Sequence, residues 1–130
     1  MPSSSPTIAS LTSEQLQSYR QGLKAQLEAK DAALAARREH GWAVAREGAR
    51  CLREEFGATD VLVFGSVVTG RGFHQRSDID LAARNVPRET YFKAVAALLN
   101  LDNDFLFDLV RLEDAPEGLR EHILTEGIPL

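Results

Sequence analysis

The chain has 130 residues, of which 44% are hydrophobic and 26% are charged, and its formal net charge is -4. This length suits one compact domain, and the composition is ordinary for a globular protein. The negative charge provides no global attraction to nucleic acid, so direct nucleic-acid binding is not expected. The single cysteine excludes an internal disulfide. Without a signal-like start or a membrane-length apolar run, we expect a cytoplasmic protein that makes no membrane contact.

The N-terminal part of the chain predicts a flexible tail and then a long helix. Residues 1–11 are rich in serine and proline, which is typical of a flexible tail. Thr12 and Gln15 have the spacing of a capping box, so a helix should begin there and continue to about Arg38. A narrow apolar stripe indicates a helix that either docks on a partner or packs at one edge of its own domain. The stripe consists of Leu16, Tyr19, Leu23, Leu27 and Leu34.

A second apolar run predicts a helical segment that packs on the core. Its members alternate at steps of three and four residues, and they are Trp42, Ala45, Ala49, Leu52 and Phe56. Gly57 suits the left-handed position that ends a helix. The pair His40-Gly41 either separates two helices or weakens one long helix. We therefore predict an N-terminal helical extension over residues 12–57 and a separate domain over residues 58–130.

The pattern then changes to strands. Val61 to Phe64 is a continuous apolar run, as expected for a strand covered on both faces. Asp78 to Ala83 and Phe105 to Arg111 predict two further strands. Pro87 can open a helix between these two strands, and the apolar residues predicted to face inward are Tyr91, Phe92, Val95, Leu98 and Leu99.

A last helix is predicted near the C-terminus. Asp114 is its expected N-cap, Glu117 completes a capping box, and Gly127 ends it. Its apolar residues are Leu119, Ile123 and Leu124. The order of elements predicts an α/β (α+β) fold, with helices packed on a small sheet.

Two aspartates in the second predicted strand indicate a metal site. Asp78 and Asp80 are two residues apart, so they share one face of the strand. Neighbouring carboxylates repel and raise each other's pKa unless a cation lies between them. Mg²⁺ is commonly held by one or two carboxylates together with substrate phosphates. The alternative is a solvated edge strand with a capping aspartate.

A third carboxylate and a Gly-Ser pair extend this prediction. Asp108 stands alone in an apolar strand, so we expect it to be buried and therefore paired or bound to metal. Beside two metal-binding carboxylates, it could act as a ligand and as the base for an attacking hydroxyl. Gly65 follows a buried strand and lets the backbone approach a phosphate, while Ser66 offers a hydroxyl and an N–H group. Gly-Ser pairs also occur at ordinary turns.

These three parts together resemble the nucleotidyltransferase superfamily that includes DNA polymerase beta, and most closely its minimal nucleotidyltransferase (MNT) branch. The shared pattern is Gly65-Ser66 after a strand, Asp78-Ile79-Asp80 on the next strand, and Asp108 on a later one. The resemblance covers roughly residues 60–112. It implies the nucleotidyltransferase fold, a small mixed β-sheet flanked by helices, here with a long N-terminal helical extension.

The resemblance also implies an activity. Asp78 and Asp80 would hold two Mg²⁺ ions, Asp108 would complete the catalytic and metal site, and ATP would be the substrate. The implied nucleotide contacts are Gly65, Ser66, Thr69, Arg71 and Ser77. Members of this size are often antitoxins encoded beside a HEPN-domain ribonuclease toxin, and some transfer AMP to a toxin tyrosine. We therefore expect AMP transfer from ATP to a HEPN-type partner protein.

Two departures from the family pattern keep other functions open. Many minimal members have arginines shortly after Gly-Ser, where this chain has Val67-Val68-Thr69, and the following loop is one residue longer at Gly72. Exposed loop cations could replace the missing arginines, and these are Arg71, His74 and Arg76. One alternative is a binding antitoxin that acts by occlusion, with homo- or hetero-oligomers forming through the N-terminal helix. A small-molecule nucleotidyltransferase ranks last, because no acceptor-binding domain is evident.

Overall fold

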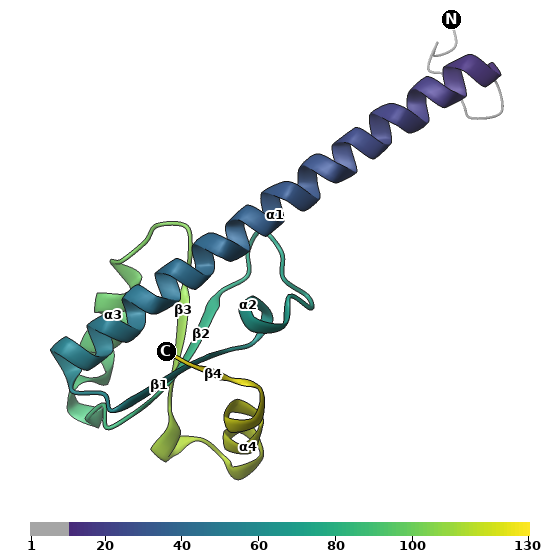
Figure 1. Cartoon of the computed structure of the whole chain (residues 1–130). Coiled ribbons are helices and arrows are strands. Elements are labelled where there is room, and N and C mark those ends of the chain that lie inside the picture. Colours follow the sequence, from purple (N-terminus) through teal and green to yellow (C-terminus); the bar gives the residue numbers. More distant parts are fainter. Residues whose placement is uncertain (1–10) are drawn as a thin grey trace, which may run out of the picture. The chain divides into compact units, whose positions relative to one another are not determined.

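The computed structural model describes residues 11–130 of the protein (Figure 1). Residues 1–10 of the predicted tail therefore lie outside the described residues. The helices are α1 (Ser13–Phe56), α2 (Ser66–Thr69), α3 (Tyr91–Leu99) and α4 (Glu117–Glu126), with 3₁₀ turns η2 (Arg88–Thr90) and η3 (Leu112–Asp114). The strands are β1 (Asp60–Phe64), β2 (Ile79–Arg84), β3 (Phe107–Arg111) and β4 (Ile128–Pro129).

Helix α1 begins as the sequence predicts. The Thr12 amide donates to Gln15 Oε1 at 2.9 Å, and the Gln15 amide donates to Thr12 Oγ1 at 3.1 Å, so the capping box is confirmed. The helix continues through His40 and Gly41, which leaves one long helix rather than two. None of the helices described over residues 11–130 combines the length and the apolar character needed to cross a membrane.

The chain divides into two compact units between Ala35 and Ala36. The first contains the N-terminal part of α1, and the second contains the rest of α1 with the sheet and the other helices. The unit around the sheet thus begins before the boundary near residue 57 that the sequence suggested. The physical reason is that α1 contributes to the core of this unit through Val44, Ala45, Ala49 and Leu52.

The sheet is mixed, as the resemblance implied. Its strand order is β3-β2-β1-β4, with β1 antiparallel to β2 and β4, and β2 parallel to β3. Strand β4 was not predicted, because its two residues are too few to show an apolar alternation. It pairs with Leu62 and Val63 of β1.

Different helices cover the two faces of the sheet. Buried residues of α1 and α3 join Val63, Ile79 and Leu81 in the larger hydrophobic cluster. On the other face, Ile123 of α4 packs in a smaller cluster that contains Phe64 and Ala82. Since alternate strand residues share a face, the aspartates at positions 80 and 108 lie on the α4 side. This placement separates the carboxylates from the main core.

Two of the predicted inward positions in α3 are wrong, and two apolar residues of α4 are also exposed. Phe92 and Leu99 are 82% and 40% exposed, because they lie far around the helix from the buried Ala94. In α4, Leu119 and Leu124 are 38% and 48% exposed. These helices are short, so one buried stripe is enough to attach each of them.

The predicted N-cap of the last helix is also wrong. Pro116 occupies that position, and Asp114 lies in η3. Its carboxylate pairs with Arg88 at 2.8 Å and with Arg111, which holds its pKa below the ordinary value. The Asp114 carboxylate therefore pairs with the guanidinium groups of Arg88 and Arg111 and does not cap α4.

Gly48 permits a close contact between α1 and the sheet. A Cβ built on it would lie 3.0 Å from Leu81 Cδ1 and 3.2 Å from Leu98 Cδ2. We expect Gly48→Ala to lower the free energy of unfolding by about 1–2 kcal/mol, because overpacking outweighs the gain in helix propensity. Gly118→Ala in α4, where nothing lies within 4 Å, should raise it by about 0.5–1 kcal/mol. Urea unfolding of both variants would contradict this account if the two changes had the same sign.

Candidate active site

The structure brings the three predicted carboxylates to neighbouring strands. Asp80 pairs directly with Asp108 in the parallel register of β2 and β3, where adjacent strands are about 4.8 Å apart. Asp78 lies just before β2 and is exposed, while Asp80 is half-buried. Two of the carboxylates thus face each other across the strand pair, and the third stands two residues before Asp80. The region is a concentrated patch of negative charge on one face of the sheet.

The electrostatics of Asp80 reflect this crowding. Burial, followed by the charges of Asp108 and Asp78, raises the pKa of Asp80 to about 6. A carboxylate that is partly desolvated beside two like charges is a candidate functional group, because structural requirements alone would favour an uncharged residue.

Asp108 is more exposed than its apolar sequence surroundings predicted. It was expected to be buried, but it is exposed, although Phe107 and Leu109 on either side are buried. Strand β3 lies at the edge of the sheet, and alternation turns Asp108 away from the main core. The evidence that Asp108 belongs to the site is therefore its position opposite Asp80, because its side chain is not buried.

The backbone at Gly65 fits directly against Asp80. Gly65 has φ +80° and precedes α2, and a Cβ built there would overlap Asp80 Oδ2 far inside the 3.0 Å limit of real Cβ contacts. Only glycine accommodates both the left-handed conformation and this approach. Ser66 then begins α2, so the Gly-Ser pair lies next to the central carboxylate.

The other predicted nucleotide contacts differ in whether their side chains are already hydrogen-bonded. Thr69 Oγ1 accepts from the Arg71 amide at 3.1 Å, and it lies 3.5 Å from the Gly65 carbonyl. Ser77 is 6% exposed, and its hydroxyl accepts from the His74 amide at 2.8 Å. These two hydroxyls are thus engaged within the loop. The side chains of the loop cations are exposed, and they are Arg71, His74 and Arg76.

Two arginines of α1 tie this site to the helix, and the sequence analysis missed both. Arg38 donates from Nε to the Val67 carbonyl at 2.7 Å and from Nη2 to the Val68 carbonyl at 2.6 Å, which fixes α2. Arg37 donates from Nη2 to the Ser77 carbonyl at 3.1 Å, just before Asp78. The only available signal was an Arg-Arg pair between the two apolar runs of α1.

A second group of potential ligands lies outside the carboxylate patch. His40 Nε2 is 2.8 Å from Asp102 Oδ2 and 3.9 Å from Asp104 Oδ2. Within residues 11–130, this is the one group of three whose ligand atoms all lie within 4.8 Å of one another. The oxygens of Asp78, Asp80 and Asp108 are more widely spaced than this limit, as expected for carboxylates that repel. The His40–Asp102 pair already acts as a hydrogen bond between α1 and the loop before β3.

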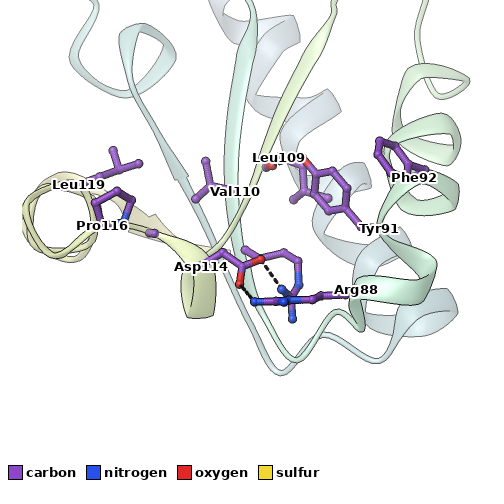
Figure 2. Close-up of a pocket in the computed structure, with 10 residues that line it drawn as sticks. Arg88, Tyr91, Phe92, Leu109, Val110, Asp114, Pro116 and Leu119 are labelled. Carbon is purple, nitrogen blue, oxygen red and sulfur yellow. Dashed lines mark hydrogen bonds and ion pairs between the residues drawn. The ribbon is translucent and has the colours of Figure 1, made fainter.

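A hollow of about 360 Å³ lies further along β3 (Figure 2). Tyr91 and Phe92 of α3 line one side, and Pro116 and Leu119 line the side near α4. It contains none of the three aspartates. The hollow is therefore a mostly apolar surface beside the strand that carries Asp108.

The raised pKa of Asp80 predicts a pH-dependent cost to stability. The folded protein binds this proton more tightly than the unfolded chain, so ionisation of Asp80 removes stability as the pH rises from about 4 to about 6. Without divalent metal, we expect Asp80→Asn to raise the unfolding free energy near neutral pH. One pKa unit is about 1.4 kcal/mol, and solvent screening at this half-exposed group reduces the expected gain to about 1 kcal/mol.

Chemical unfolding in the presence of a chelator, near pH 7 and near pH 4, measures this effect. Most of the gain should be lost near pH 4, because Asp80 is then protonated in the folded protein and about half protonated in the unfolded chain. Asp60→Asn is a matched control, since Asp60 is exposed and lies 3.7 Å from Arg84. An equal gain from both substitutions would contradict the electrostatic explanation.

Comparison with known proteins agrees with this geometry. The family model described as polymerase beta, nucleotidyltransferase matches residues 49–130. The chain belongs to this nucleotidyltransferase family. The nucleotidyltransferase fold expected from Gly65-Ser66, Asp78-Ile79-Asp80 and Asp108 is thereby confirmed. No curated protein matches the chain.

Solved structures resemble this nucleotidyltransferase over much of its length. One described as a minimal nucleotidyltransferase is 32% identical, with a TM-score of 0.52 over 76% of this chain and 94% of that chain. A toxin–antitoxin structure with AMP-PNP is 26% identical, with a TM-score of 0.54 over 62% and 67% of the two chains. A mutant of the toxin–antitoxin MntA-HpeT is 26% identical, with a TM-score of 0.55 over 65% and 69%.

Proposed function

We propose that the protein is a Mg²⁺-dependent nucleotidyltransferase that transfers AMP from ATP to a partner protein, as the antitoxin of a HEPN-type ribonuclease toxin. The observation that carries the catalytic part is the pairing of Asp80 with Asp108 beside Gly65, in a chain of this family. The AMP and toxin parts are supported by similarity to a toxin–antitoxin structure with AMP-PNP.

The three carboxylates suit magnesium. They offer only oxygen ligands, which Mg²⁺ prefers. Burial and then the charges of Asp108 and Asp78 raise the pKa of Asp80, and a bound divalent cation would offset both by favouring the ionised carboxylate. Asp78, Asp80 and Asp108 would hold two ions. Bound there, Mg²⁺ would offset the charge of the triphosphate and lower the pKa of the acceptor hydroxyl.

The residues of the chain then have distinct tasks. The backbone at Gly65 and Ser66 would receive the triphosphate, because no Cβ blocks the approach at Gly65. Asp108, which is exposed, would accept the proton of the acceptor hydroxyl. The acceptor oxygen forms a bond to the α-phosphorus, the bond from that phosphorus to the bridging oxygen breaks, and pyrophosphate leaves. The exposed side chains of Arg71 and Arg76 would contact phosphate from the loop.

One observation favours a second candidate, a binding antitoxin that acts by occlusion. Helix α2 carries Val67, Val68 and Thr69 where many minimal members have arginines, and the nearby Arg38 already binds backbone carbonyls of α2. Triphosphate would then be held weakly, and neutralisation of a toxin would depend on contact alone.

Incubation with radiolabelled ATP, Mg²⁺ and the HEPN-type toxin encoded beside this chain distinguishes the two candidates. We expect label to appear on the toxin with the wild-type protein and not with Asp78→Asn/Asp80→Asn. Complex formation by the wild type without any labelling would contradict the proposal. If the double variant still neutralises the toxin fully, occlusion is the mechanism.

A further inference from the structure

The N-terminal unit exposes a row of large apolar side chains. On α1, Tyr19, Leu23 and Leu27 are 54%, 44% and 54% exposed. With the half-buried Leu16 and Leu34 they form the apolar stripe of α1. Helical stability in proteins comes mainly from packing of such a face, and the interior Gly22 weakens this helix further. The stripe is therefore a surface against which a partner would pack.

The stripe has an internal symmetry that suggests its partner. Leu16 and Leu34 lie nine residues on either side of Ala25, and Leu23 and Leu27 lie two residues on either side. When a helix pairs with an antiparallel copy of itself about such a centre, each leucine meets a leucine of the other copy. Leu16 would face Leu34, and Leu23 would face Leu27.

The charges beside the stripe are arranged about nearly the same point, because their opposite-charge pairs are centred within one residue of Ala25. At 100° per residue, one flank of the helix carries two cations and then two anions: Arg20, Lys24, Glu28 and Asp31. Equivalent flanks of two antiparallel helices meet, so Arg20 would face Asp31 and Lys24 would face Glu28 of the second copy. Within one chain, Lys24 Nζ lies 3.9 Å from Glu28 Oε1, and both side chains are exposed, so each can also reach a second copy.

A parallel arrangement lacks this complementarity. It would place the charged flank against the other flank of the second helix, which carries Gly22, Gln26, Ala29 and Ala33. A toxin is another conceivable occupant, but symmetry of the stripe about Ala25 is expected for a partner that carries the same sequence.

We propose that residues 13–35 bind the same segment of a second copy, forming an antiparallel two-helix coiled coil. The paired segment is about 35 Å long at 1.5 Å per residue. Lys30 lies within the apolar face, and its aliphatic stem covers the seam while the ammonium group reaches solvent. A single polar residue in such a seam also favours one register. This self-association is independent of the nucleotidyl transfer proposed above.

The solution mass of the full chain tests the pairing. Light scattering should give twice the 14.3 kDa of the monomer, and Leu23→Glu/Leu27→Glu should halve the measured mass. Ser18→Glu/Gln21→Glu adds the same charges on the opposite side of the helix and should leave the mass doubled. A monomeric wild type, including one that associates only when the toxin is added, would overturn the proposal.

A charge exchange tests the antiparallel contacts without removing the leucines. Arg20→Glu/Lys24→Glu makes the flank acidic, and Glu28→Lys/Asp31→Lys makes it basic. Each variant alone should be monomeric, and an equimolar mixture should regain the doubled mass. A mixture that stays monomeric would contradict the pairing.

Crosslinking then fixes the orientation. In a Cys51→Ser background, Gln26→Cys lies near the centre and should form a disulfide-linked dimer. Leu34→Cys lies in the stripe far from the centre, so the two thiols of an antiparallel pair are too far apart to react, whereas those of a parallel pair would be adjacent. Efficient crosslinking through Leu34→Cys would show a parallel pair and overturn the proposal.

Discussion

Replacing Asp80 by asparagine should lower the rate of AMP transfer by about 10²–10³-fold, the scale on which preorganised charge-stabilising groups contribute to catalysis. Asp80 is the half-buried member of the carboxylate patch and faces Asp108 across β2 and β3. The substitution keeps the size of the side chain but removes the charge that would hold the metal. Turnover numbers measured with labelled ATP check the effect.

The fold and the partner complex should survive this substitution, since the metal-free Asp80→Asn protein is expected to be more stable. Asp60→Asn, on β1 and outside the site, should retain wild-type turnover. Asp108→Asn should also lose activity, and the double variant should lose little more than either single one, because groups that act as a unit are not additive. Turnover within a few-fold of wild type in Asp80→Asn would refute the catalytic assignment.

Gly65→Ala is expected to have the largest effect of any single methyl addition in the site. The new Cβ would overlap the Asp80 carboxylate, and alanine would have to adopt φ +80°. Left-handed backbone alone costs about 1–2 kcal/mol. Displacing Asp80 adds a steric cost, so we expect a total loss of about 3 kcal/mol or more in unfolding free energy, and loss of activity. Urea unfolding and the transfer assay measure the two losses.

Gly72→Ala separates the two causes. Gly72 has φ +70°, but nothing lies within 4 Å of a Cβ built there. It should show only the backbone cost, about 1–2 kcal/mol. If the two variants were equally stable, the contact between residue 65 and Asp80 would have no energetic weight.

The sequence predicted those features that depend on local pattern. The capping box of Thr12 and Gln15, the apolar run of β1 and the alternation around Asp78 and Asp80 are all encoded within a few residues. The helix-ending role of Gly57 is another, and its φ is +75°. These features placed Asp80 on β2, with Asp78 immediately before that strand.

What the sequence did not predict depends on contacts between distant segments. The exposure of Asp108 follows from the edge position of β3, which is a property of the sheet order. Asp114 pairs with Arg88 and Arg111 and does not occupy the expected N-cap position of the last helix. The contacts of Arg37 and Arg38 with the loops of the site span about thirty to forty residues, and no local periodicity signals them.

Titration of Mg²⁺ into the protein with a non-hydrolysable ATP analogue, followed by calorimetry, tests the carboxylate site most directly. We expect saturable Mg²⁺ binding by the wild type and by Asp60→Asn, and none by Asp78→Asn/Asp80→Asn. The absence of Mg²⁺ binding by the wild type, or equal binding by the double variant, would contradict the assignment of these aspartates as the metal site.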